Sequence, residues 1–547
     1  MWARQFASQF WHGDCYPRWF MNVNAGYGGP SGFFYPPLTN YVSSLFWPFL
    51  QGRNNAGWLT SGYSLAVAFI LSGITAYLWL RSLAGRTAAV IGALAYMIAP
   101  YHLATDVYIR GASAELWVFV WLPLVLLSAE GLFRRSWWAS PGVALSYSLA
   151  TLSHPSTALC FAPVALAYVI LLSESKVRFR LSSTFAGALA LGTTLDAVYL
   201  LPATFDQHKA SVARYTSGAT DYHRNWLLPS RGEILAALQY LTDKLAGRVT
   251  ELRPGVAGYI LILLVTLSTV AAVGALFVIC RKYEAGSRMR RIALFYTTVT
   301  VITFFLTTKA SALIWQATGF LKFLQFPSRL NVILAICLAV LAALAAPHAL
   351  QARSRAITLP LALIALAWLA VDGWAPKHVY AVWGSNPAKS NQHWVQAQME
   401  PLDMMARPAN EDVPADGSEF DHFVATHPAK AVRLDASLTN HSSGTALVES
   451  WQPRRVLLHL DSSQASRLTI NYFYYEGWQA RVEGAKDIIP ITPSPEGFMQ
   501  LDVAPGSYEL VVELPPDGAE RAGKLISLLS LAVLGVMLIT AAQRRTR

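Results

Sequence analysis

The sequence predicts a polytopic α-helical membrane protein with a mainly-β domain inserted before its last helix. Hydrophobic residues make up 54% of the 547 residues and charged residues only 14%, which is too apolar for an ordinary soluble protein. Apolar runs long enough to cross a hydrocarbon core recur along the chain. Between residues 431 and 514 the pattern changes to short alternating segments separated by turn residues, which indicates a small antiparallel β-sandwich.

The length rule gives about eleven membrane spans. They cover residues 57–80, 87–105, 116–132, 137–153, 157–172, 183–203, 256–280, 292–308, 330–346, 357–371 and 525–542. We expect 35–50, which opens with two prolines, to be interfacial or re-entrant, and 233–245 to form a short amphipathic helix. The chain then divides into an outer loop (1–56), a membrane domain (57–371, with an outer loop at 204–254), a soluble domain (372–522, β-sandwich from about 431) and a last helix with a basic tail (523–547).

Basic residues fall mostly in the short loops and alternate regularly from one loop to the next. The net charge of +11 therefore follows the positive-inside rule, and nucleic acid is not indicated as a partner. The basic loops are placed in the cytoplasm, and the outer loops and the soluble domain on the opposite side. Because residues 1–35 then lie outside without a preceding span, we expect an upstream start rather than a truncated gene product. The four cysteines have no paired spacing and are expected to be packing residues.

Residues 12–38, the opening motif, are too polar and too rich in Gly and Pro to cross a bilayer. Asp14 and Arg18 lie four residues apart within it. Asp14 is either a catalytic base or a turn residue, with about equal weight, and Arg18 either grips a phosphate oxygen or pairs with Asp14. The motif is also full of aromatic rings that suit the headgroup layer of a membrane. These rings are Tyr16, Trp19, Phe20, Tyr27, Phe33, Phe34 and Tyr35.

A second group of charged residues lies in the loop that follows the span at 87–105. Asp106 and Arg110 are one helical turn apart and are expected to pair with each other. Glu115 follows just before the next span, so a carboxylate–guanidinium–carboxylate group lines this outer loop. We weigh a structural clamp and a functional group evenly, because ion-pair networks serve both purposes.

Four further polar residues lie near the outer ends of spans, where ionisable groups are functional candidates by default. They are His154, Asp196, and Gln325 and Arg329 in the motif FLQFPSRLN. Each has a plainer interpretation as well. Arg329 is alternatively a snorkelling side chain, Asp196 a partner in a hydrogen bond to a neighbouring helix, and His154 a structural donor.

Taken together, three carboxylates (Asp14, Asp106, Glu115) and three guanidiniums (Arg18, Arg110, Arg329) are predicted at the outer surface. The forked guanidinium matches phosphate oxygens, and a nearby carboxylate takes a proton from a hydroxyl nucleophile. These carboxylates and guanidiniums therefore favour transfer of a group from a lipid phosphate. No P-loop, dinucleotide-binding, HExxH or GxSxG motif is present, and the histidines show no metal spacing.

Several motifs carry a family resemblance. The bacterial "6-pyruvoyl-tetrahydropterin synthase-related" integral membrane proteins are resembled by GDCYPRWF, NAGYGGPSGFFYPPL, DVYIRGASAE, SHPSTAL, VYLLPA and LQFPSRL. The stretch YYEGWQARVEG resembles the outer domain of related large bacterial membrane proteins. The synthase-related family resembles glycosyltransferase superfamily C (GT-C), whose members use polyprenyl-phosphate sugars. The resemblance implies that Asp14 is the essential carboxylate of the first outer loop, with Asp106 and Glu115 as the nearest matches in the second. Because the opening loop has a single Asp, the resemblance does not imply a metal or other cofactor, and it leaves a divalent metal open.

The function expected from the sequence is therefore sugar transfer from a polyprenyl-phosphate donor to a periplasmic glycan, lipid or protein, in cell-envelope assembly at the bacterial inner membrane. Asp14, Asp106 and Glu115 are the catalytic candidates. The substrate-binding candidates are Tyr16, Arg18, Trp19, Arg110, His154, Asp196, Gln325 and Arg329. The alternatives are a transporter or flippase for a lipid-linked or anionic substrate, and a non-catalytic scaffold.

Overall fold

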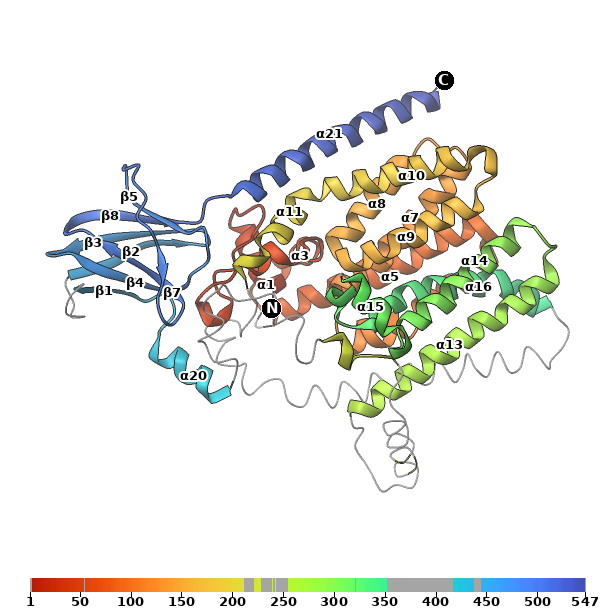
Figure 1. Ribbon diagram of the computed structural model, residues 1–547, viewed down its shortest axis with the longest axis horizontal. Coiled ribbons are helices and arrows are strands. Elements are labelled where there is room, and N and C mark those ends of the chain that lie inside the picture. Colours follow the sequence, from red (N-terminus) through yellow and green to blue (C-terminus); the bar gives the residue numbers. More distant parts are fainter. Residues whose placement is uncertain are drawn as a thin grey trace. The chain divides into compact units, whose positions relative to one another are not determined.

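The computed structural model describes residues 2–53, 55–210, 221–227, 239, 242, 254–319, 321–351, 417–436 and 444–546 (Figure 1). The chain folds into two compact units. Unit 1 comprises Met1–Thr60, Ala197–Arg214 and Ala388–Ile526, and unit 2 comprises Ser61–Asp196, Tyr215–Pro387 and Ser527–Arg547. The predicted helix at 233–245, the predicted span at 357–371 and residues 372–416 lie outside the described residues, apart from 239 and 242.

Seven helices within the described ranges are long and apolar enough to cross a membrane. They are α5 (Ala56–Ala84), α7 (Ser113–Phe133), α9 (Pro155–Leu172), α13 (Pro254–Lys282), α14 (Arg288–Leu306), α16 (Asn331–Gln351) and α21 (Gly518–Thr546). Two bent helix pairs raise the number to nine. The predicted span at 137–153 appears as α8 (Ala139–Ser153), which at 15 residues is shorter than a usual span.

Each bent pair replaces one predicted continuous span. The span at 87–105 is α6 (Arg86–Met97) followed by the π-helical segment η2 (Tyr101–Ile109), with a 41° bend. Pro100 lies at the break, where its missing N–H cannot continue the α-helical hydrogen bonds. The span at 183–203 is α10 (Ser175–Leu195), whose direction changes by 70° before α11 (Ala197–Phe205) and η3 (Asp206–Lys209).

Unit 2 is a bundle whose helices differ in how much of their surface is covered. In α7 the most apolar stretch is 78% buried, whereas in α13 it is 17% buried, so α7 is central and α13 lies at the periphery. Helix α6 packs closely on α16 at Gly92, where an added Cβ would lie 2.6 Å from the Ala339 carbonyl. Small residues permit this approach between apolar helices. The remaining short elements are η6 (Tyr222–Arg224), η7 (Lys309–Ser311), α15 (Ala312–Thr318), η8 (Leu321–Leu324) and η9 (Pro327–Leu330).

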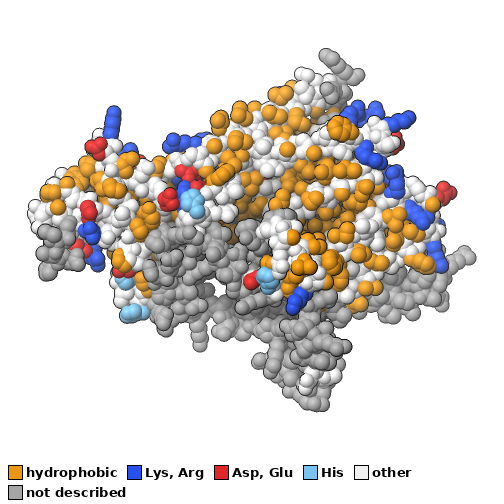
Figure 2. Space-filling view, viewed as in Figure 1, with side chains coloured by type: hydrophobic (Ala, Val, Ile, Leu, Met, Phe, Trp, Pro, Cys, Tyr) orange, Lys and Arg blue, Asp and Glu red, His pale blue; other side chains and the backbone are white. Residues whose placement is uncertain are grey.

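The surface of the helices is dominated by hydrophobic side chains, as Figure 2 shows. Lys and Arg side chains gather at one end of the helices in the same view. An apolar surface with basic side chains gathered at one end suits a helical bundle embedded in a bilayer.

Unit 1 contains the antiparallel β-sandwich expected from the alternating pattern. One sheet has the strand order β1-β4-β7-β6 and the other β2-β3-β8-β5. The strands are β1 (Val432–Ala436), β2 (Gly444–Gln452), β3 (Arg455–Ser462), β4 (Ser466–Phe473), β5 (Gln479–Val482), β6 (Thr492–Pro493), β7 (Phe498–Val503) and β8 (Gly506–Glu513). Leu468 and Leu501 from the first sheet and Leu458 and Leu510 from the second fill one core. β2 and β6 were not expected, because β2 is largely exposed and β6 has two residues.

The opening motif folds onto the sandwich in unit 1. Trp19 and Phe33 belong to the sandwich core, and Trp19 is fully buried beside Tyr472. The Phe473 N–H donates to the Tyr27 carbonyl (2.8 Å), which extends β4 toward the motif. Gly28 is required between them, because φ is +75° and a Cβ would lie 2.6 Å from the Trp19 ring nitrogen.

This packing corrects one interpretation of the sequence. The aromatic rings Trp19, Phe20, Tyr27 and Phe33 are at most 2% exposed, so they pack inside the protein and do not present an edge to headgroups. Four short helices accompany them in this part of the chain: α1 (Trp2–Trp11), α2 (Ser31–Phe34), α3 (Leu38–Ser44) and α4 (Trp47–Leu50). The last two cover most of 35–50, and neither is long enough to cross a bilayer. A further short helix, α20 (Gly417–Thr426), precedes β1.

Candidate functional site

Asp14 follows α1 in a tight turn. Its Oδ1 accepts the N–H of Tyr16 (3.2 Å), so the turn role expected as an alternative is present. The side chain is partly exposed and has no ion pair with a described residue. Burial raises the pKa of the Asp14 carboxyl, and the Tyr16 N–H, the Gln9 side chain, Arg454 and Arg18 oppose that rise. A carboxylate with a raised pKa and no ion pair is suited to accept a proton.

Arg18 pairs with a carboxylate that the sequence did not suggest. Its Nε lies 3.3 Å from Glu520 Oε2, and its Nη2 donates to the Val198 carbonyl (2.7 Å). Arg454 grips the same Glu520 in a fork, with Nη1–Oε2 at 3.0 Å and Nη2–Oε1 at 2.9 Å. We call Arg18, Arg454 and Glu520 the Glu520 network. The Tyr16 ring covers the Arg18 guanidinium at 4.2 Å, so Tyr16 contacts Arg18 directly.

Unit 2 holds a second charged group, the Glu115 network, at the start of α7. Glu115 is 1% exposed and Asp106 is fully buried, whereas 28% of the Arg110 side-chain surface is accessible. Arg110 Nη1 lies 3.2 Å from Asp106 Oδ1 and 2.5 Å from Glu115 Oε2. The pairing of Asp106 with Arg110 that their spacing predicts is therefore present. The π-helical turn of η2 places Tyr101 in the same group, where its hydroxyl donates to Glu115 Oε2 (2.9 Å).

Two more predicted residues complete the Glu115 network. Arg329 Nε lies 2.7 Å from Glu115 Oε1, and His154 Nε2 lies 3.5 Å from the same oxygen. The structure thus brings together Asp106, Arg110 and Glu115 with Arg329 from η9 and His154 from the α8–α9 junction. Burial lowers the pKa of His154 to about 4, so its imidazole is neutral at pH 7. The network thus contains two carboxyl groups and two guanidiniums.

The remaining predicted residues lie elsewhere in the fold. Asp196 sits at the break between α10 and α11, where the Ser148 hydroxyl of α8 donates to its Oδ1 (2.5 Å). This is the hydrogen bond to a neighbouring helix that the sequence left as one alternative. Trp19 packs in the sandwich core, and Gln325 occupies a left-handed turn (φ +63°) between η8 and η9.

Tyr101, Arg454 and Glu520 were missed by sequence reasoning. Glu520 carried a weak signal, because Asp517 and Glu520 have the spacing of a capping box and the Glu520 N–H donates to Asp517 Oδ1 (2.9 Å). No sequence pattern pointed to Tyr101 or Arg454.

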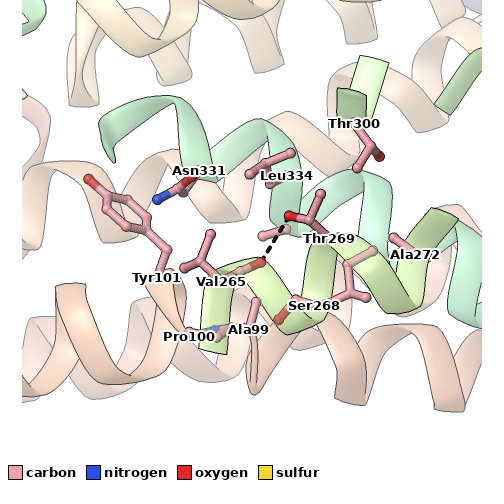
Figure 3. Close-up of a pocket in the computed structure, with 12 residues that line it drawn as sticks. Ala99, Pro100, Tyr101, Val265, Ser268, Thr269, Ala272, Thr300, Asn331 and Leu334 are labelled. Carbon is pink, nitrogen blue, oxygen red and sulfur yellow. Dashed lines mark hydrogen bonds between the residues drawn. The ribbon is translucent and has the colours of Figure 1, made fainter. Parts of the chain in front are cut away.

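The described residues of unit 2 line a small cavity and a larger groove. The cavity of about 20 Å³ lies beside Tyr101, with Asn331, Ser268 and Thr300 on its wall, and has room for one water molecule (Figure 3). The groove of about 740 Å³ runs between α9 and α14. Its wall is almost entirely apolar, extends along α14 from Arg291 to Leu306, and includes Leu330 of η9. Within the described residues, no cluster of three or more His, Cys, Asp or Glu side chains is arranged to hold a metal ion.

The comparisons with known proteins give structural likenesses and no sequence relatives. No protein-family model matches the chain, and no curated protein does. The fold is similar to arabinofuranosyltransferase AftD from Mycobacteria, with a TM-score of 0.42 and 16% identity over 78% of this chain. It is also similar to ArnT from Cupriavidus metallidurans, bound to undecaprenyl phosphate (TM-score 0.28, 13% identity, 64% of this chain and 73% of ArnT) and in the apo state (0.29, 13%, 86% and 92%).

The chain corresponds to only 26% of the AftD chain. Likenesses at this level assign no chemistry to this chain. The resemblance to the 6-pyruvoyl-tetrahydropterin synthase-related family stays a prediction.

Proposed function

We propose that this chain is a membrane glycosyltransferase that moves a sugar from a polyprenyl-phosphate donor to an acceptor hydroxyl on the extracytoplasmic side. One observation carries the proposal: unit 2 combines a long apolar groove with guanidiniums beside its lining. Leu330 lines the groove, and Arg329 precedes it in η9. The lining along α14 spans about 22 Å at 1.5 Å per residue. A polyprenyl phosphate matches this arrangement, because its apolar chain fits the groove and its phosphate suits the adjacent guanidinium.

The Glu115 network retains donors that a phosphate can use. All hydrogen bonds of Arg110 to described residues use Nη1, which leaves its Nε and Nη2 hydrogens for a ligand. Arg329 donates from Nη1 to the Leu324 carbonyl and pairs through Nε with Glu115. Glu115 therefore orients both guanidiniums, and bidentate contacts to a phosphate favour Arg for this role.

Asp14 of unit 1 is the proposed base. It takes the proton of the acceptor hydroxyl while the acceptor oxygen forms a bond to the anomeric carbon. The bond between that carbon and the phosphate oxygen breaks, and the polyprenyl phosphate leaves with the bonding electrons. The raised pKa of Asp14 supports proton acceptance at near-neutral pH.

The first experiment measures release of lipid phosphate by the full chain in nanodiscs with a panel of polyprenyl-phosphate sugars. Asp14→Asn is expected to lower the rate by roughly 10²–10⁴-fold, because it removes general-base catalysis. Asp502→Asn, at an exposed ion pair of the same unit, is the control and is expected to keep the parent rate. Equal rates for Asp14→Asn and the parent would remove Asp14 from the mechanism, and no release by the parent with any donor would refute the proposal.

A second pair of variants tests the groove. Leu294 lines it and is 46% exposed, so Leu294→Trp fills part of its volume. We expect the KM for the donor to rise about tenfold, equivalent to 1.4 kcal/mol of binding. Leu145→Trp, on α8 at 49% exposure and outside the groove lining, is the matched control. The groove has no part in donor binding if both variants keep the parent KM.

The two broken helices favour a second candidate, transport of a lipid-linked or anionic substrate. Discontinuous helices form the substrate sites of many transporters, and the hydropathy pattern did not predict the two in this chain. Asp196 at one break has a buried Oδ2 without a hydrogen-bond partner in the described residues. Movement of a fluorescent lipid phosphate across vesicles containing the protein, without release of its sugar, would favour this candidate.

A further inference from the structure

The turn between β2 and β3 places one charged side chain of the sandwich against the opening motif. Arg454 is fixed there twice, because its carbonyl accepts the Leu514 N–H (3.0 Å) and its Nε donates to the Leu514 carbonyl (2.8 Å). Its two terminal nitrogens hold both oxygens of Glu520. This bidentate arrangement fixes direction as well as distance.

The same contacts reach Arg18. Glu520, with 8% of its side chain accessible, also pairs with Arg18, which is 6% accessible. Both guanidiniums lie within 6 Å of the Phe33 ring centre, Arg18 at 5.6 Å and Arg454 at 5.5 Å. Glu520 thus holds both guanidiniums beside the Phe33 ring of the opening motif.

The charges of the Glu520 network do not cancel. Two guanidiniums face one carboxylate, so these three residues carry one positive charge in excess. Beside them, Lys209 pairs with both Asp206 and Asp517, a group with one negative charge in excess. Asp14 is the acidic group on which the positive excess acts, and Arg454 opposes the burial-induced rise of its pKa along with Arg18. Tyr41 of α3 is a further titratable group that interacts with Asp14.

We propose that Arg454 is a positioning residue for the opening motif. It holds Glu520, and through Glu520 it holds Arg18, so the sandwich supplies part of the positive charge that faces Asp14. The inference rests on the proposed role of Asp14 for its functional meaning. The sandwich is then a structural part of the candidate catalytic loop.

The test measures the pH at which the Asp14 carboxyl loses its proton, and it does not depend on enzyme activity. Carbodiimide with glycinamide labels protonated carboxyls, and trypsin releases Asp14 in the peptide 5–18, in which it is the sole acidic side chain. Mass spectrometry of this peptide over a range of pH gives the midpoint at which labelling stops. Arg454→Gln is expected to raise the midpoint by roughly 0.5–1 pH unit, because one cation is lost.

Two further variants exclude a general loosening of the structure. Glu520→Gln removes the negative charge between the cations and is expected to move the midpoint down, opposite to Arg454→Gln. Arg454→Lys retains the charge and is expected to lie nearer the parent than Arg454→Gln. Arg467→Gln, at an exposed ion pair on β4, is the control and is expected to leave the midpoint unchanged.

The proposal is overturned if Arg454→Gln and the parent give the same midpoint, or if Arg454→Gln and Glu520→Gln move it in the same direction. Should Arg454→Gln fail to fold, Glu520→Gln decides, since a downward shift supports the network and any other result opposes it. Loss of transfer activity in the parent would refute the proposed function and leave this labelling result standing.

Discussion

The two charged networks differ in composition. In the Glu115 network of unit 2, two carboxylates meet two guanidiniums, and both carboxylates are nearly inaccessible to solvent. In the Glu520 network of unit 1, two guanidiniums meet one carboxylate, and the nearby Asp14 has no ion pair among the described residues. Both networks are largely buried, since only 6% of the Arg18 side chain and 8% of the Glu520 side chain are accessible, and an uncompensated charge is costly in either place. The Glu115 network fixes two guanidiniums on one buried carboxylate, whereas the unpaired Asp14 agrees with its proposed role as a base.

The largest expected effect comes from removing the centre of the Glu115 network. Glu115→Ala leaves Arg110 and Arg329 without their shared partner in a buried place, so we expect a loss of about 3–5 kcal/mol in unfolding free energy. Asp14→Ala, at a partly exposed residue without an ion pair, is expected to cost much less. Thermal unfolding in detergent measures both. Similar melting temperatures for the two variants would contradict the difference proposed between the Glu115 network and the opening motif.

A smaller loss is expected from a single hydroxyl. Tyr101→Phe removes the group that donates to Glu115 and accepts from Arg110, at a ring that is 2% exposed. A loss of about 1–2 kcal/mol follows from leaving buried polar atoms with fewer partners. Tyr108→Phe, at a ring 43% exposed in the same helical segment, serves as the comparison. If both variants unfold like the parent, the hydroxyl has no part in the network.

The smallest effect is a pH dependence carried by Asp14. Because burial raises its pKa in the folded state, the carboxylate is lost at a higher pH than in an unfolded chain. Transfer activity is therefore expected to fall as the pH drops through this raised pKa. The same group stabilises the fold below its unfolded pKa and loses that contribution as the pH rises through the folded one. Initial rates of transfer over a pH series measure this fall in activity. A fall that begins only at or below the ordinary Asp pKa would contradict the prediction.

Periodicity and length predicted much of the fold. Every predicted span within the described residues coincides with a helix or a bent helix pair, and the alternating stretch forms the sandwich. The breaks after Met97 and at Asp196 were missed, because a bent pair has the same average hydropathy as a straight span. The strand β2 was missed because its exposed face lacks clear alternation.

The candidate site was predictable only where partners are close in sequence. The Asp106–Arg110 pair follows from helical spacing, and Glu115 lies five residues further on. The Arg18–Glu520 pair joins residues that are remote in sequence, and no local pattern encodes such a contact. Aromatic rings in a polar segment suggested a membrane surface, whereas Trp19 and Phe33 are buried in a core that other parts of the chain complete.

The hydrogen bonds between the opening motif and the sandwich bear on how the chain is made. Asn22 accepts from Lys430, 408 residues later, and Tyr27 donates to the His427 carbonyl across 400 residues. At about 5–20 residues per second, a ribosome needs roughly 20–80 s to supply those partners. During that interval Trp19 and Phe33 have no sandwich core to enter. The opening motif is therefore synthesised early but completes its folding late. Until the last strands are synthesised, the new chain depends on protection from aggregation.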